Sequence, residues 1–152
     1  MKLVLDEWLW ADLGGDNGHA RLQESFRFLE AVCKRCDRIV IPTGTEFARK
    51  FWDLCSKAAS GDLRHGIVRY FRQRFEQNSS KTYKFALKTD TPEQLEPERN
   101  VKPDDHYLVL TFRQSNADLL VTTDRPLISA LRKLGIPAVD RDDFLREYLS
   151  GA

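Results

Sequence analysis

The chain has 152 residues, 41% hydrophobic and 31% charged, with a formal net charge of +1, which is typical of one globular domain over residues 1–152. No segment approaches the roughly 18 consecutive apolar residues of a membrane helix, and the N-terminus lacks the form of a secretory signal, so we expect a cytoplasmic protein without membrane contact. Three cysteines are an odd number for a disulfide framework, and the CKRC motif at 33–36 has no second pair to complete a zinc site.

The predicted elements alternate between strands and helices. Short apolar runs predict strands in KLVLDEW, where the strand ends at Asp6, and at 37–42, 118–123 and 136–139. Apolar stripes and helix-start signals predict helices at 20–34, 43–59, 63–77, 103–115, 125–135 and 141–150. The segment 12–18 is predicted as a loop, and 78–102 stays unassigned, with KTYKFALK at 81–88 either a strand or a loop. This order predicts a three-layer α/β/α sandwich around a small parallel sheet.

Acidic residues occur where such a sheet would gather its loops. They follow predicted strands or open the neighbouring helices: Asp6, Glu46, Asp104, Asp105 and Asp124. The carboxyl ends of parallel strands meet at one edge, where α/β folds bind ligands. Carboxylates gathered there would repel one another unless a cation neutralised them, and oxygen ligands without Cys or His suit Mg²⁺ or Mn²⁺. We therefore expect a metal site able to activate water and to stabilise charge on a phosphate.

Helix geometry distinguishes Asp105 from Asp104. Three, four and seven residues after Asp105 come Leu108, Val109 and Phe112, which are all apolar. Asp105 should therefore lie on the helix face that packs against the sheet. Asp104 is better suited to favour the positive end of the helix dipole from the exposed side.

Each acid also has a purely structural explanation. Asp6 and Asp124 could cap the turn or helix that follows them, and Glu46 could pair with Lys50 one helical turn later. Such an ion pair is worth only ~0.2–0.5 kcal/mol. The order and position of the acids together favour a site over separate caps and ion pairs.

Basic residues are concentrated between residues 64 and 88. They are accompanied by a single acid, Glu76, and comprise Arg64, Arg69, Arg72, Arg74, Lys81, Lys84 and Lys88. Such a cluster is either a solvated helix face or a surface that contacts nucleic-acid phosphates. We select Arg69, Arg72 and Lys84 as candidate substrate contacts. Tyr70 and Phe71 are near enough to offer stacking, but helical spacing favours a core position for them.

Several motifs together resemble the PIN domain family, which includes VapC-type toxins and RNA-processing nucleases. These motifs are VLDEW, IPTGTEF, DDHYLVL, NADLLVTTDRPL and AVDRDDFLREYL. The fourth is the most specific, and its Asp124 follows Asp105 by 19 residues, as one helix and one strand require. The resemblance covers both ends of the chain and leaves residues 60–100 poorly matched.

The resemblance implies a Rossmann-like sandwich and a Mg²⁺- or Mn²⁺-dependent endoribonuclease. The family's acidic positions match Asp6, Glu46, Asp105 and Asp124, which we take as the catalytic set. Asp6, Asp105 and Asp124 would be metal ligands, Glu46 would bind or orient a water at the metal, and Thr122 matches a hydroxyl residue expected to contribute to substrate binding. RNA is the expected substrate, and an antitoxin protein and a homodimer are the partners that the family implies.

Two alternatives remain open at the level of sequence. The first is a catalytically inactive PIN-like module that binds nucleic acid or protein, with its acids serving as caps and ion pairs. The second is a metal-dependent phosphatase or a nucleotide-binding α/β protein. The lack of a glycine-rich phosphate loop argues against nucleotide binding.

Overall fold

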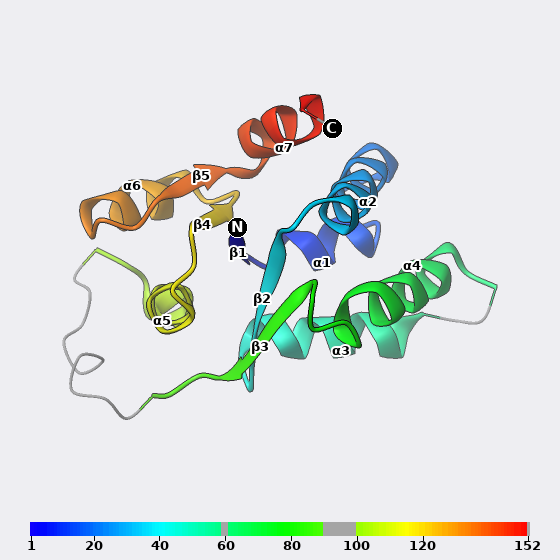
Figure 1. Ribbon diagram of the computed structural model, residues 1–152, viewed down its shortest axis with the longest axis horizontal. Coiled ribbons are helices and arrows are strands. Elements are labelled where there is room, and N and C mark those ends of the chain that lie inside the picture. The colour runs from blue at the N-terminus through cyan, green and yellow to red at the C-terminus, as the bar shows by residue number, and fades with distance from the viewer. Residues whose placement is uncertain (59–60, 90–99, 152) are drawn as a thin grey trace.

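Five strands form one sheet in the order β3-β2-β1-β4-β5 in the computed structural model, which describes residues 1–58, 61–89 and 100–151 (Figure 1). The strands are β1 (Lys2–Leu5), β2 (Arg38–Thr43), β3 (Thr82–Ala86), β4 (Leu119–Thr122) and β5 (Ala138–Asp140). All neighbouring strands in this sheet run parallel. The predicted α/β class is therefore confirmed.

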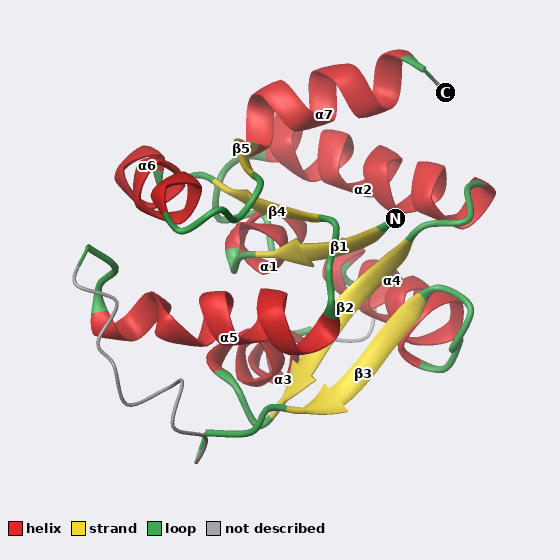
Figure 2. Ribbon diagram, turned by 60° about the vertical axis from the view of Figure 1, so that its left-hand side comes forward, coloured by secondary structure: helices red, strands yellow, loops and turns green. Residues whose placement is uncertain are grey.

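Helices cover both faces of the sheet and complete three layers (Figure 2). One face is covered by α1 (Trp8–Leu13), α2 (His19–Lys34), α3 (Glu46–Lys57), α4 (Leu63–Phe71) and α7 (Arg141–Ser150). The other face is covered by α5 (His106–Ser115) and α6 (Arg125–Lys133). A π-helical turn (Arg72–Glu76) extends α4, and a 3-10 turn (Pro103–Asp105) precedes α5.

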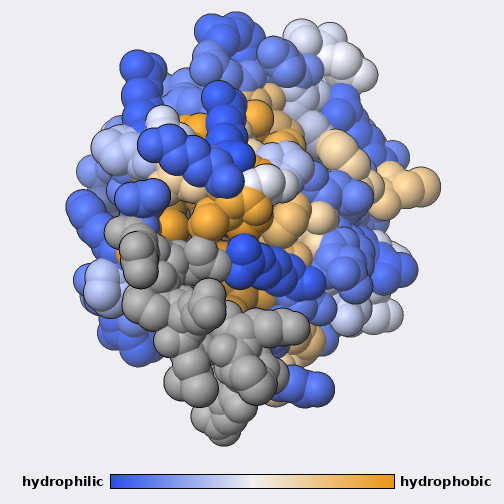
Figure 3. Space-filling model, turned by 90° about the vertical axis from the view of Figure 1, so that its left-hand side faces the viewer, coloured by the Kyte–Doolittle hydropathy of each residue, from blue (hydrophilic) through white to orange (hydrophobic). Residues whose placement is uncertain are grey.

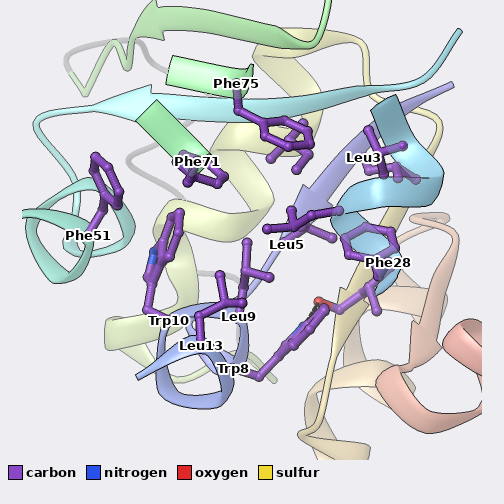
Figure 4. Close-up of a cluster of buried hydrophobic side chains, with 14 of the residues drawn as sticks. Leu3, Leu5, Trp8, Leu9, Trp10, Leu13, Phe28, Phe51, Phe71 and Phe75 are labelled. Atoms are coloured by element: carbon purple, nitrogen blue, oxygen red, sulfur yellow. Dashed lines mark hydrogen bonds between the residues drawn. The ribbon is translucent and has the colours of Figure 1, made fainter. Parts of the chain in front are cut away.

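Two hydrophobic cores lie on the two sides of the sheet. Leu3 and Leu5 of β1 belong to the core beneath the larger helical layer, and Val4 belongs to the core beneath α5 and α6. Successive side chains of a strand point to opposite faces, so a strand buried on both faces must be apolar throughout. The larger core is rich in aromatic rings, including Trp10 and Phe71 (Figure 4).

The direction in which strands are added to the sheet reverses at β1. The chain passes from β1 to β2 and β3 on one side, then returns to β4 and β5 on the other side. Right-handed crossovers require the connecting helices to change faces at this reversal, which explains why α5 and α6 lie opposite α2 and α3. Folds with such a reversal bind ligands where the loops at the carboxyl ends of the two diverging strands separate, here those after β1 and β4.

Helix α1 is a difference from the sequence prediction, which assigned no helix to residues 8–13. Its six residues are fewer than periodicity can identify, and tertiary contacts stabilise them. The indole Nε1 of Trp8 donates to the Val121 carbonyl at 3.0 Å, and that of Trp10 donates to the Phe47 carbonyl at 2.8 Å. The glycine-rich loop consequently begins at Gly14 rather than at Asp12.

The ambiguous segment KTYKFALK contains strand β3, which pairs with β2 from Ile39 opposite Thr82 to Thr43 opposite Ala86. Tyr83 and Phe85 pack against the core beneath α5, while Lys84 points away and is exposed. This mixture is typical of an edge strand, which is protected against further pairing by charged side chains. Residues 90–99 of the unassigned section lie outside the described residues.

None of the helices in the described residues combines the length and apolar character needed to cross a bilayer. On the face in Figure 3, hydrophilic side chains predominate, and hydrophobic residues are visible between them.

A buried ionic network joins the first and last parts of the chain. Arg141, at the start of α7, is 1% exposed and donates through Nε to the fully buried Asp12 of α1 at 2.9 Å. The Ser25 hydroxyl and the Asn17 amide both donate to the same Asp12 carboxylate at 2.7 Å. Arg141 also donates to Glu24 at 2.5 Å, so the network fixes α1, α2 and α7 together.

We expect Arg141→Met to lower the free energy of unfolding by about 3–5 kcal/mol, because it leaves the Asp12 carboxylate buried without its cation. Arg146→Met is the matched control on the same helix, since Arg146 pairs with Asp143 at the surface, where ion pairs contribute about 0–1 kcal/mol. Urea denaturation of both variants measures the difference. Equal losses would show that the buried network does not stabilise the fold.

Candidate acidic site

Asp6 and Asp124 lie together because β1 and β4 are neighbours in the sheet. Leu5 is the register partner of Val121, and the Asp6 amide donates to the Val121 carbonyl at 3.1 Å. One residue further along β4, the Thr122 hydroxyl donates to Asp6 Oδ2 at 2.6 Å and accepts from the Asp124 amide at 3.1 Å. The end of β4 is therefore hydrogen-bonded to the acid that follows β1.

Thr122 is buried, whereas its predicted role in substrate binding would require an accessible hydroxyl. Its side chain is fully buried, and its single hydroxyl proton is already donated to Asp6. A direct contact with substrate is therefore not the arrangement observed. Thr122 instead orients the Asp6 carboxylate and fixes the backbone that carries Asp124.

Asp124 is the N-cap of α6, as the structural explanation of this residue predicted. Its Oδ1 accepts from the Leu127 amide at 3.0 Å, which satisfies one of the free amides at the start of the helix. The cap needs only one of the two carboxylate oxygens. Capping and membership of an acidic site are therefore compatible.

Asp105 has unfavourable electrostatic surroundings. It is half-buried at the start of α5, whereas Asp104 beside it is exposed, in agreement with the helix-face argument. Burial raises the pKa of the Asp105 carboxyl, and the negative charges of Asp6 and Asp124 raise it further. The structure thus brings three of the predicted acids within electrostatic range of one another.

Glu7 is a further acid at this edge, and it was not predicted from the sequence. Its charge also raises the pKa of Asp105, and its Oε2 accepts from Lys50 at 2.7 Å. That hydrogen bond raises the pKa of the Lys50 ammonium. The only sequence signal for Glu7 was its position beside Asp6, after the first strand.

Glu46 lies at the edge of the group and has an ion-pair partner of its own. Both carboxylate oxygens of Glu46 accept from Arg49, one of them from Nε at 2.9 Å, and these bonds lower the pKa of the Glu46 carboxyl. The alternative explanation had assigned Lys50 as this partner, but Lys50 pairs with Glu7. Glu46 is therefore held by a neighbouring cation, unlike Asp105.

The Tyr107 hydroxyl lies among these acids without a hydrogen-bond partner in the described residues. Burial raises the pKa of this phenol, and the charges of Asp6, Glu7, Asp105 and Glu46 raise it further, so it stays protonated. An unpaired buried hydroxyl costs about 1–3 kcal/mol. Tyr107 is thus a donor that a water or ligand oxygen at this edge would satisfy.

The composition of the group fits a hard divalent cation, because the donors are carboxylate and hydroxyl oxygens. A cation would also remove the repulsion that raises the pKa of Asp105. Within the described residues, no three Asp, Glu, His or Cys side chains are already gathered closely enough to hold a metal ion. The charges therefore favour a cation, while the carboxylates are not preassembled around one point.

The predicted basic contacts do not form a single surface with the acids. Arg69 and Arg72 line a hollow with His65 along α4 and the π-helical turn. Lys84 lines a different groove, which also contains Glu46. Of the two aromatics considered for stacking, Phe71 is 1% exposed in the core, as its helical spacing favoured, and Tyr70 is half-buried against Phe26.

Comparison with models of known protein families gives no match, and comparison with curated proteins gives no similar sequence. The chemistry of this edge is therefore inferred from the chain's own residues.

We expect Asp105→Asn to raise the melting temperature at pH 7 in the presence of a chelator. The pKa of Asp105 is raised above its ordinary value of 3.8, so the folded state holds this proton more tightly than the unfolded chain does. Protonated Asp105 contributes stability below the pKa that this carboxyl has in the unfolded chain. This stability is lost as the pH rises through the higher pKa that it has in the folded protein. The advantage of the variant should therefore vanish near pH 3. Asp104→Asn is the control, and an equal effect at this exposed neighbour would contradict the electrostatic explanation.

We expect Asp124→Ala to lower the free energy of unfolding by about 0.5–2 kcal/mol, because it removes the side chain that caps α6. Asp124→Asn should stay close to wild type, since asparagine caps helices about as well as aspartate. Chemical denaturation in chelator measures both. If the two variants lose the same stability, the cap is not the structural role of Asp124.

Proposed function

We propose that the protein is a PIN-like endoribonuclease that requires Mg²⁺ or Mn²⁺. The observation that carries this proposal is Asp105, whose pKa is raised by burial and by the charges of Asp6 and Asp124 at the edge where the sheet reverses. Carboxylates that cost stability when ionised are characteristic of sites that a cation completes. The motifs that resemble PIN domains give independent support from the sequence.

In this proposal Asp6, Asp105 and Asp124 hold the cation. When bound, a divalent ion lowers the pKa of a water and stabilises charge on the phosphate that is attacked. Thr122 keeps Asp6 oriented through its 2.6 Å hydrogen bond, and Asp124 reaches the site from a rigid helix start. Glu46, whose carboxylate is fixed by Arg49, orients the attacking water.

RNA is the proposed substrate because basic and aromatic side chains line the groove that contains Glu46. Lys84 and Glu46 line the same groove, and the guanidinium of Arg72 lies 6.0 Å from the ring centre of Trp52 in that groove. These cations would contact the phosphates on either side of the one that is cleaved. A toxin role with an antitoxin partner, a homodimer and a cytoplasmic location belong to the same proposal and rest on the resemblance and composition.

A second candidate function is a binding module without catalysis. The observation that favours it is that Asp124 caps a helix and Glu46 is neutralised by Arg49, so both have structural roles without a metal. The two functions predict different responses to Mn²⁺. Only the nuclease should gain stability and cleave RNA when the ion is added.

We expect wild type to cleave a labelled single-stranded RNA in Mn²⁺ and to be inactive in chelator. Asp6→Asn and Asp105→Asn should each lose at least about 100-fold in cleavage rate, because even residues that only orient a metal ligand cost ~10–100-fold. Mn²⁺ at 100 times its Kd should add about 2.7 kcal/mol to the stability of wild type. Asp104→Asn is the control and should retain cleavage.

Retained cleavage in Asp6→Asn and Asp105→Asn would contradict the assignment of the site. Absence of both cleavage and Mn²⁺ stabilisation in wild type would favour the binding module. Hydrolysis of a small phosphomonoester in place of RNA would favour a phosphatase.

A further inference from the structure

A groove of about 530 Å³ lies along α3, and Glu46 lines it, whereas Asp6, Asp105 and Asp124 do not. Its walls come from α3, from the end of β2 and from β3, and the charge of Glu46 in its wall also acts on Tyr107 among the acids. A volume of this size is typical of small-molecule sites, which range from about 300 to 1,000 Å³. The groove is therefore large enough for part of a nucleotide chain.

The floor of the groove is aromatic. The rings of Trp10, Phe51 and Phe71 are turned toward one another there (Figure 4), with centroids 5.0 Å apart between Trp10 and each phenylalanine. All three belong to the core and are at most 5% exposed. The floor is thus rigid and apolar.

Trp52 stands at the rim and is 52% exposed. It does not belong to the apolar stripe of α3, which packs through Phe47, Phe51 and Leu54. Its ring is held in place by Phe51, with centroids 5.2 Å apart. An indole that the core does not need, and that is supported from one side, offers a flat surface to a ligand.

Cations border this aromatic surface, and two of them are paired with the acids Glu46 and Glu76 of the same groove. The Arg72 guanidinium lies 6.0 Å from the Trp52 ring centre, Lys84 lines the opposite wall, and Arg49 lies at the Glu46 end. Lys84 is fixed by an ion pair of 2.7 Å with Glu76, and Arg49 is fixed by Glu46. Cations around an aromatic surface are the combination that binds single-stranded nucleic acid, with phosphates on the cations and bases on the rings.

We propose that this groove binds a nucleobase of the RNA chain, and that the base stacks on Trp52. This inference rests on the proposed ribonuclease function for its substrate. A base in a duplex is paired and stacked and cannot enter a groove between a helix and a strand. Trp52 therefore selects RNA that is single-stranded at this nucleotide.

The test uses a single-stranded octauridylate and a blunt RNA duplex of eight base pairs, both in chelator at 50 mM salt, so that binding is measured without cleavage. Trp10 and Trp52 both line the groove, so a change in intrinsic fluorescence reports on a ligand there, and the anisotropy of labelled octauridylate measures affinity in the Trp52 variants. We expect octauridylate to quench this fluorescence and the duplex to leave it unchanged.

Trp52→Ala should weaken octauridylate binding on the order of 5- to 150-fold, as the loss of one stacked base requires, and Trp52→Phe should restore most of it. Trp52→Ala should keep the salt dependence of binding, whereas Arg72→Gln should reduce the slope of log affinity against log salt by about 0.7. Leu63→Ala removes another exposed apolar side chain, 57% exposed, and should bind as wild type does.

Equal octauridylate affinity in wild type and Trp52→Ala would overturn the proposal, as would quenching by the duplex. Neither result contradicts the nuclease assignment if wild type cleaves RNA in Mn²⁺. Binding that depends on Trp52 in a protein that never cleaves would instead support the groove and reject the nuclease.

Discussion

The parallel pairing of β1 with β4 is the constraint on which the acidic edge depends. Leu5 lies opposite Val121, so the residues after both strands leave the sheet at the same level. The Thr122 hydroxyl then joins the two ends by bonding Asp6 and the Asp124 amide. Apolar burial sets this register, because a slip of one residue would turn the buried side chains of each strand to the wrong face.

The same edge carries an energetic cost that other parts of the molecule offset. Ionised Asp105 is disfavoured by burial and by its acidic neighbours. The Arg141 network fixes α1 to α2 and α7, and Trp8 donates to Val121 across the first loop. These contacts hold the backbone around Asp6 in place although the carboxylates repel one another. Unfavourable charges gathered in this way are typical of functional sites.

Most of the architecture could be predicted from sequence because apolar periodicity records which faces are buried. The parallel sheet and the long helices followed from that pattern, and so did the inward position of Asp105. Helix α1 and strand β3 could not be assigned, since one has six residues and the other is a five-residue edge strand with a lysine at its centre. Their conformations depend on partners far away in the sequence, which periodicity does not record.

The site was predicted less completely than the fold. Positions after strands identified Asp6 and Asp124, but the hydrogen bonds of Thr122 and the nearness of Glu7 depend on side-chain directions that only the folded structure gives. Trp52 had one sequence signal, which was a tryptophan outside the apolar stripe of its helix. The buried partner of Arg141 had none, because Asp12 is 129 residues away along the chain.

Calorimetric titration of the metal-free protein with Mn²⁺ at pH 5 in two buffers of different ionisation enthalpy tests the central claim most directly. The pKa of Asp105 is raised above that of an ordinary aspartate, so an ion that binds its carboxylate should release more protons there than an ordinary aspartate would release at the same pH. A metal site predicts saturable Mn²⁺ binding with proton release that Asp105→Asn reduces and Asp104→Asn preserves. No binding at millimolar Mn²⁺, or binding that Asp105→Asn leaves unchanged, would contradict a metal site formed by these acids.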